Sequence, residues 1–358
     1  MVRGGVAMDR ILGPLLRRAA VAVGGAEPLR RSLTTVLERA ARRGMGADVE
    51  VEVEIDAEAG TVSVIAFRSV VEGQADADEI ELEEARAIDP DAELGDALGC
   101  VVDLDELVPH VRGALVVPAE HYPALEAFFR DLFWDVEVVR TLPRRPADLD
   151  TAVERLVAVL HQEPFAAALR PGCDAVELNA HELMLGGSLP PPLRQLLAGT
   201  AGMGDVPGAP QLSLGRAGYR LLSPLESQQE HAAWTQRREE VPPRATWPAG
   251  VVHPAFAWNT DWLPVALGSR GAEPAELLVV DPIGVGADRP GELLCVSFEE
   301  PGWWALGIDV AGLAHVWLVL HEHGLLVHVP PGVDPIATGK VEAVVQHLMP
   351  RRRWVDAG

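Results

Sequence analysis

The chain has 358 residues, of which 48% are hydrophobic and 23% are charged, as expected for a globular protein of about two domains. Its formal net charge of −23 argues against nucleic-acid binding by the chain as a whole, because such binding requires that phosphates be neutralised. No apolar run approaches the roughly 20 residues that cross a bilayer, and Pro14 and Arg17-Arg18 interrupt the apolar start of the chain. With three widely spaced cysteines that form neither a disulfide framework nor a zinc spacing, these features predict a cytoplasmic protein without membrane association.

The first part of the chain predicts two helices followed by a small sheet. Residues 27–43 place Leu29, Leu33 and Leu37 one turn apart, which is typical of an amphipathic helix. Residues 49–56, VEVEVEID, alternate Val or Ile with acidic residues, the pattern of a strand with one dry face. The expected elements are helices within 9–43, strands over 49–56 and 61–71, a short helix within 79–96 and a short strand over 100–107.

Charge is distributed unevenly along this first part. Residues 1–45 hold nine arginines against three acidic residues, whereas residues 46–109 hold twenty acidic residues against two arginines. Arg39, Arg42 and Arg43 fall at the end of a predicted helix, where cations stabilise the helix dipole. That structural role is one explanation for them, and contact with an acidic partner is the other.

Further along, residues 109–146 give weaker signals, with a helix expected after Pro123 and then a strand. Residues 142–150, LPRRPADLD, have the composition of a linker. The second part predicts helices over 152–169, after the prolines at 190–192, over 311–326 and near 341–348, with short apolar strands between residues 210 and 310.

These elements predict an α+β fold of two domains, each a small antiparallel or mixed sheet packed with helices. The expected boundaries are 1–141 for the first domain, with its core at 9–108, 142–150 for the linker, 151–328 for the second domain, and 329–358 for a C-terminal helix and tail.

Within the first domain the order of elements resembles the N-terminal domain of the transcription elongation factor NusA. That family shows two helices, a strand of the form V-x-V-x-I-D, an acidic turn with Gly, a return strand, an I-x-L-x-x-A-R helix and then L-G-D. The matching residues are Val51, Val53, Ile55, Asp56, Gly60, Ile80, Leu82, Ala85, Arg86, Leu94, Gly95 and Asp96.

The resemblance implies docking on the flap region of RNA polymerase, close to emerging RNA, with Arg39, Arg42 and Arg43 as the basic cluster. Nucleic-acid contact would then be weak and local. Two departures bear on this expectation. Residues 108–128 replace the family's long basic helix, which puts flap binding in doubt, and no S1 or KH RNA-binding domain follows.

The second domain resembles the SMI1/KNR4 (SUKH) superfamily. Residues 181–203, HELMLGGSLPPPLRQLLAGTAGM, supply an acidic residue, a Leu-Gly pair, Leu-Pro and a helix. A Trp-x-Pro strand follows at Trp262, a strand ends in Asp281-Pro282, and a glycine-led strand begins at Gly291. The usual Asn-Gly after the helix is altered to Thr200-Ala201-Gly202. The resemblance implies recognition of another protein, in many bacterial members a toxin, and does not imply catalysis.

The tryptophans of the second part are candidates for partner binding. Trp303 and Trp304 are neighbours and would point to opposite faces of a strand, so one of them is expected at the surface. An exposed indole beside Glu299 and Glu300 would suit a protein interface. Simple core packing is the alternative for both indoles.

No residue pattern predicts catalysis, a cofactor or a metal site. His321-Glu322-His323 is the strongest metal candidate, but histidines two apart share a face only on a strand, and this segment predicts a helix end. Residues 284–292 match neither a P-loop nor a dinucleotide fingerprint. We therefore expect a non-catalytic protein that associates with RNA polymerase through its first domain and recognises a protein partner, such as a toxin, through its second. The alternative is a transcription elongation or termination regulator with the second domain as its sensor.

Overall fold

A computed structural model describes residues 6–57, 59–76, 78–143, 148–185, 187–205, 208–240, 258–270, 273–284, 286–298, 302–329, 333–349 and 353–356. The chain forms two compact units, Met1–Leu142 (unit 1) and Pro143–Gly358 (unit 2). Both units combine helices with β-sheets, which confirms the predicted α+β class. The finer boundaries expected from the sequence, with a linker over 142–150, stay a prediction, since residues 144–147 lie outside the described residues.

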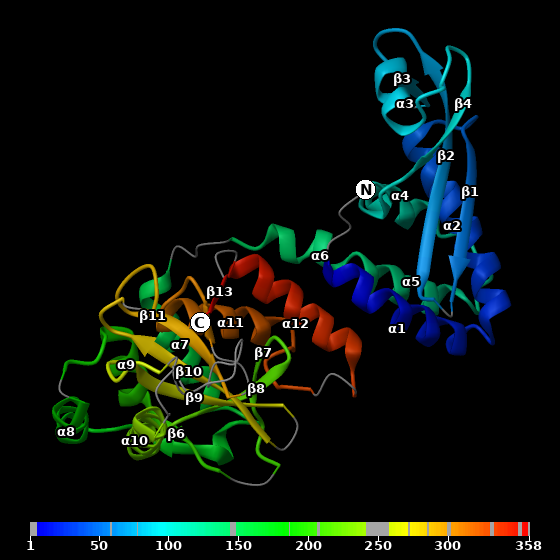
Figure 1. Cartoon of the computed structure of the whole chain (residues 1–358). Coiled ribbons are helices and arrows are strands. Elements are labelled where there is room, and N and C mark those ends of the chain that lie inside the picture. Colours follow the sequence, from blue (N-terminus) through cyan, green and yellow to red (C-terminus); the bar gives the residue numbers. More distant parts are fainter. Residues whose placement is uncertain are drawn as a thin grey trace. The chain divides into compact units, whose positions relative to one another are not determined.

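Unit 1 packs helices beside a four-stranded sheet (Figure 1). Its elements are α1 (Val6–Ala22), α2 (Ala26–Met45), β1 (Glu50–Asp56), β2 (Thr61–Val71), β3 (Glu79–Glu81), α3 (Leu82–Ile88), β4 (Ala97–Val101), α4 (Leu104–Ala114), α5 (Tyr122–Leu132) and α6 (Trp134–Glu137).

The long strand β2 organises this sheet. It pairs antiparallel with β1 and with β4, and parallel with β3. On β1, Val51 is buried while Glu50, Glu52 and Glu54 are exposed. The alternation read from the sequence is therefore that of a strand whose apolar side chains face the core and whose carboxylates face water.

Helix α2 carries the apolar face that the leucine spacing predicts, with Leu29, Leu33 and Val36 fully buried. Helix α4 packs against α2 at a point where Gly44 leaves room for the ring of His110, because a Cβ at Gly44 would lie 3.0 Å from that ring. Small residues at a helix crossing allow close approach of the two backbones. Helix α1 packs against α5.

Two expectations for residues 100–139 were wrong. The strand expected over 100–107 ends at Val101, and α4 begins at Leu104, where the side chain of Asp103 accepts a hydrogen bond from Asp105 N at 3.0 Å and caps the helix. The strand expected after α5 is replaced by α6, since Trp134 is buried against unit 1 and the segment pairs with no described strand.

Unit 2 is built on a seven-stranded antiparallel sheet with helices around it. Its elements are α7 (Leu149–Leu160), β5 (Leu169–Pro171), α8 (Ala175–Leu185), α9 (Pro191–Gly199), β6 (Thr200–Met203), β7 (Leu212–Leu214), β8 (Ala217–Leu221), α10 (Pro224–Glu240), β9 (Leu263–Arg270), β10 (Glu273–Asp281), β11 (Glu292–Ser297), β12 (Gly302–Ala305), α11 (Val310–Glu322), α12 (Pro335–Leu348) and β13 (Arg353–Asp356). The strands β5 and β6 form a separate pair.

The large sheet is buried on both faces. On β10, Leu277 and Val279 pack into an aromatic cluster, while Leu278 and Val280 face the other way, and all four are fully buried. The aromatic cluster contains Trp234, Trp258, Trp262 and, at its edge, Trp303 and Phe298. The unbroken apolar run of β10 therefore indicates a strand whose two faces are both covered by other parts of unit 2.

The helix expected over 152–169 was too long, because α7 ends at Leu160, four residues before Pro164. The segment predicted as a helix and tail, 329–358, contributes α12, which packs on α11, and β13, which pairs with β12 at the edge of the large sheet. None of the helices in the described part of the chain combines the length and apolar character that spanning a bilayer demands.

Candidate interaction surfaces

The three arginines singled out from the sequence lie on the C-terminal half of α2 and are all exposed. Arg39, Arg42 and Arg43 are spaced by three and four residues, so they share one face of the helix. We call this set the arginine patch. Its position at the C-terminal end of α2 is favourable for positive charge, since the helix dipole is negative there.

Each arginine of the patch also makes a local contact within unit 1. Arg39 Nη1 donates to the carbonyl of Val116 at 2.7 Å, and Arg42 Nη1 lies 3.9 Å from Glu38. The guanidinium of Arg43 lies over Gly113 of α4, where a Cβ would come within 1.9 Å of Nη1. None of these contacts in the described part of the chain is with a buried carboxylate, and the three side chains are exposed, so their charge remains directed at solvent.

A groove of about 400 Å³ lies between α4 and α5 of unit 1. We call it the α4–α5 groove. Its floor is apolar, with Val111, Phe129 and Phe133 almost fully buried. It exists because the chain breaks between α4 and α5 at the segment that contains Pro118, in the region where the sequence departs from the family's long helix. The volume is within the range of sites that take small ligands or side chains of a partner.

The rim of the α4–α5 groove is polar and electrically balanced. Arg112 pairs with Glu137 at 3.2 Å, and Arg130 and Glu126 stand on the exposed side of α5. An aromatic floor within a charged rim is typical of protein interfaces. Sequence analysis missed this groove: it expected a helix after Pro123 and then a strand, and neither element says that α4 and α5 leave a groove between them with Phe129 and Phe133 on its floor.

The tryptophans proposed for partner binding are both half-buried. The ring of Trp303 packs edge-on against Trp262 at 5.1 Å between centroids, and its Nε1 donates to the carbonyl of Gly286 at 2.8 Å. Trp304 faces the other side of the sheet, across from Cys295. These contacts favour the packing explanation for Trp303. Glu299 and Glu300 lie outside the described residues, so a partner role for the set stays a prediction.

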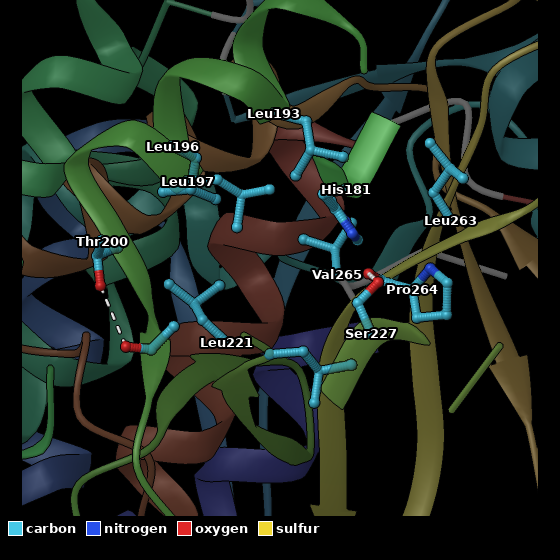
Figure 2. Close-up of a pocket in the computed structure, with 12 residues that line it drawn as sticks. His181, Leu193, Leu196, Leu197, Thr200, Leu221, Ser227, Leu263, Pro264 and Val265 are labelled. Carbon is cyan, nitrogen blue, oxygen red and sulfur yellow. Dashed lines mark hydrogen bonds between the residues drawn. The ribbon is translucent and has the colours of Figure 1, made fainter. Parts of the chain in front are cut away.

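A cavity of only about 10 Å³ lies beneath α8 and α9 in unit 2 (Figure 2). Figure 2 shows His181, Ser227, Pro264 and Leu263 on one side of it and Leu196, Leu197 and Leu221 on the other. Ser227 Oγ donates to the carbonyl of Pro264 at 2.7 Å, and burial lowers the pKa of His181. Such a volume holds about one water molecule, so the cavity is not a ligand site.

A buried polar cluster joins Tyr219, Glu276 and Cys295 across the large sheet. Tyr219 Oη donates to Glu276 at 2.6 Å, and Cys295 Sγ lies 3.2 Å from the same carboxylate. Burial raises the pKa of Tyr219 well above its ordinary value, with the charge of the neighbouring groups adding to the effect. All three groups are nearly inaccessible, so the cluster fixes strand positions and offers no reactive surface. In the described part of the chain, no three His, Cys, Asp or Glu side chains are placed to hold a metal ion.

Comparison with known proteins bears on unit 1. The model of the NusA N-terminal domain family matches residues 26–107, from α2 to the first turn of α4. No curated protein matches the chain. Among solved structures, the solution structure of the N-terminal domain of NusA from B. subtilis is similar at 18% identity, with a TM-score of 0.20, covering 35% of this chain and 97% of that one. The resemblance of unit 2 to SMI1/KNR4 stays a prediction. Residues 26–107 of unit 1, which include the arginine patch, therefore match the NusA N-terminal domain.

Proposed function

We propose that this chain is a non-catalytic binding protein that associates with the transcription machinery through unit 1 and recognises another protein through unit 2. The role proposed for unit 1 rests on the match of residues 26–107 to the NusA N-terminal domain. The proposed partner of unit 1 is RNA polymerase, with nucleic-acid contact that is weak and local.

The arginine patch supports this assignment. Unit 1 is strongly acidic over residues 46–109, so an exposed basic face on α2 gives it a defined orientation toward an acidic protein surface or toward RNA. Arg39 and Arg43 also contact α4 or the segment that follows it. The patch therefore ends beside α4, the helix that also borders the α4–α5 groove.

Purified RNA polymerase provides the test. We expect the full chain to bind the polymerase and Arg39→Ala/Arg42→Ala/Arg43→Ala to weaken binding about tenfold or more, the scale of a hot-spot cluster. The matched control is Arg17→Ala/Arg30→Ala/Arg31→Ala, which removes the same charge from exposed positions of α1 and α2. Equal losses of affinity in both variants would mean that binding depends on the overall positive charge of the helices and not on the arginine patch. If the unaltered chain does not bind, RNA polymerase is not the partner of unit 1.

For unit 2 we propose recognition of a protein partner by a SUKH-like domain, with a bacterial toxin as the specific class that the resemblance implies. The motif residues occupy structural positions. Glu182 pairs with Arg194 at 2.7 Å and accepts a hydrogen bond from Leu189 N, and Asp281 ends β10. An acidic residue that fixes the turn before α9 explains why the motif joins Glu182 to Leu189-Pro190.

The competing proposal is a regulator of elongation or termination in which unit 2 acts as a sensor. Transcription in vitro with purified polymerase separates the two. A change in pausing or termination on adding the full chain supports the regulator. Unchanged transcription despite polymerase binding supports a tether, and protection against a co-encoded toxin then tests the immunity role.

A further inference from the structure

Helix α8 of unit 2 carries an exposed apolar face. Val176, Leu183 and Met184 are 75%, 82% and 71% exposed, and Ala180 between them is exposed as well. Positions i, i+4, i+7 and i+8 lie on one side of a helix. Single exposed apolar residues are ordinary on a protein surface, whereas several on one helix face mark an interaction site.

The opposite face of α8 holds the helix firmly in unit 2. Leu178 and His181 are buried, and the His181 ring lies 3.1 Å from the amide of Gln228 on α10. The side chain of Asp174 accepts hydrogen bonds from the backbone N–H groups of Val176 and Glu177, and the carboxylate of Glu177 accepts one from the backbone N–H of Asp174 at 2.9 Å, which is a capping box. The helix is therefore fixed without help from its exposed apolar side chains, which leaves them preorganised for a partner.

The surroundings of this face are acidic. Residues 171–190 contain three carboxylates and no lysine or arginine. Glu182 is neutralised by Arg194 at 2.7 Å, whereas Asp174 and Glu177 form no ion pair in the described part of the chain. Glu177 lies seven residues before Met184, so its carboxylate borders the apolar face.

A second helix extends the apolar surface. Leu225 of α10 is 63% exposed and lies one turn before Gln228, whose side-chain amide contacts His181 of α8. Two adjoining helices that present exposed apolar side chains between carboxylates match the geometry by which amphipathic helices are bound, with methionine supplying adaptable contact.

We propose that the outer face of α8 docks a basic amphipathic helix of another protein. Its apolar anchors would cover Val176, Leu183 and Met184, and its lysine or arginine side chains would meet Glu177 and Asp174. The negative charge beside this face selects a basic occupant, because an acidic or neutral helix would gain apolar contact but would bring no cation to the carboxylates of Asp174 and Glu177.

The test uses the full chain and a fluorescent 18-residue peptide of leucine and lysine, with leucine at helical spacing i, i+3, i+4 and i+7. We expect saturable binding by fluorescence anisotropy at physiological salt, and Leu183→Ser/Met184→Ser should weaken it about tenfold or more. The control Ile283→Ser/Val333→Ser removes apolar side chains that are also exposed in unit 2 and should leave binding unchanged. Both variants should melt at the temperature of the unaltered chain, since the substituted side chains are exposed.

Several results would overturn the proposal. Equal affinity of the unaltered chain and the α8 variant would mean that the peptide binds elsewhere through the net negative charge. Equal binding of a leucine–glutamate peptide would remove the role of Glu177 and Asp174. Sedimentation that reveals a dimer lost in the α8 variant would assign the face to a second copy of this chain. Binding to anionic phospholipid vesicles that the same variant abolishes would assign it to a membrane surface.

Discussion

Units 1 and 2 place their charged side chains differently. In unit 1, the carboxylates of β1 and the arginines of α2 stand in solvent. In unit 2, Asp281 is 0% exposed and Glu292 is 2% exposed. Asp281 accepts hydrogen bonds from Ile283 N, Gly284 N and Gly286 N, and Glu292 accepts from the backbone N–H of Gly307 at 2.7 Å.

This difference in burial distinguishes charged side chains that stabilise the fold from charged side chains that a partner can reach. A buried carboxylate that satisfies several backbone N–H groups fixes a loop, and its removal leaves those donors unpaired. An exposed arginine or glutamate contributes little to stability, so any role it has in binding can be tested without unfolding the protein. Substitution of the buried charged residues of unit 2 should therefore mainly lower its stability. Substitution of the exposed charged residues of unit 1 should mainly weaken its binding to a partner.

The largest effect should come from Asp281→Ala. Three backbone donors of the loop after β10 would lose their acceptor, which should lower the free energy of unfolding of unit 2 by about 3 to 5 kcal/mol. Urea unfolding followed by tryptophan fluorescence measures this, since eight of the nine tryptophans belong to unit 2. The matched control, Glu52→Ala on β1, should change stability by no more than about 0.5 kcal/mol. A loss below about 1 kcal/mol for Asp281→Ala would remove the distinction between the units.

Glu226 should make unit 2 sensitive to acid. Burial alone would raise the pKa of this carboxyl, but hydrogen bonds from Ser223 and the neighbouring Arg220 guanidinium lower the pKa to about 2. Because the folded pKa lies below its ordinary value, the stabilisation is complete above about pH 4.5 and is lost as the pH falls toward 2. We expect Glu226→Gln to lower the unfolding free energy by about 2 to 3 kcal/mol at pH 6, after allowance for partial solvent exposure.

The difference between the unaltered chain and Glu226→Gln should shrink as the pH is lowered to 2.5, because this carboxyl is then protonated in the unfolded chain and most of the stabilisation from its lowered folded pKa is lost. Urea unfolding at pH 6 and pH 2.5 measures it. Glu154→Gln, an exposed substitution on α7, controls for general charge effects. A constant gap between the two pH values would contradict the depressed pKa.

Asp131 sharpens the comparison because it is an exception in unit 1. It is 5% exposed and pairs with Arg18, which joins α5 to α1. Since Arg18 is half-exposed, Asp131→Ala should cost about 1 to 2 kcal/mol, less than the loss of a fully buried pair. Faster hydrogen exchange in α1 and α5, with α2 and β1 unchanged, is the expected observation. Arg130→Ala, which removes a weaker contact with Asp131 at 3.7 Å, should leave exchange nearly unchanged.

Periodicity predicted the elements whose side chains have one dry face. The valines of β1 and the leucines of α2 are spaced for a single buried side, so type and position followed from the sequence. The segment after Phe133 misled, because an apolar run of that length suits either a strand or a buried helix, and only tertiary packing around Trp134 decides between them. The exposed arginine patch could be located from charge alone, whereas the α4–α5 groove depends on where two helices separate.

The spacing of residues along the sequence also did not predict which polar side chains are buried in unit 2. Glu276 and Cys295 lie on different strands, and only the sheet register brings them to Tyr219. The exposed face of α8 had a readable signal, since Val176, Leu183 and Met184 have helical spacing. Spacing alone does not say which side of a helix is covered, and an apolar face is normally assigned to the core.

The smallest effect on stability, and the finest test of the arginine patch, should come from Gly113→Ala in α4. A Cβ at this position would lie 1.9 Å from Arg43 Nη1, the far end of a flexible side chain, so the guanidinium should move while the helix stays. The gain in helix propensity should offset the lost contact and leave the unfolding free energy within about 0.5 kcal/mol of the unaltered value. Binding to RNA polymerase should nevertheless fall about as far as in Arg43→Ala, and the double variant should show no further loss, since both changes act through one side chain. Normal polymerase binding by Gly113→Ala together with a loss in Arg43→Ala would mean that the charge of Arg43 matters and its position over α4 does not.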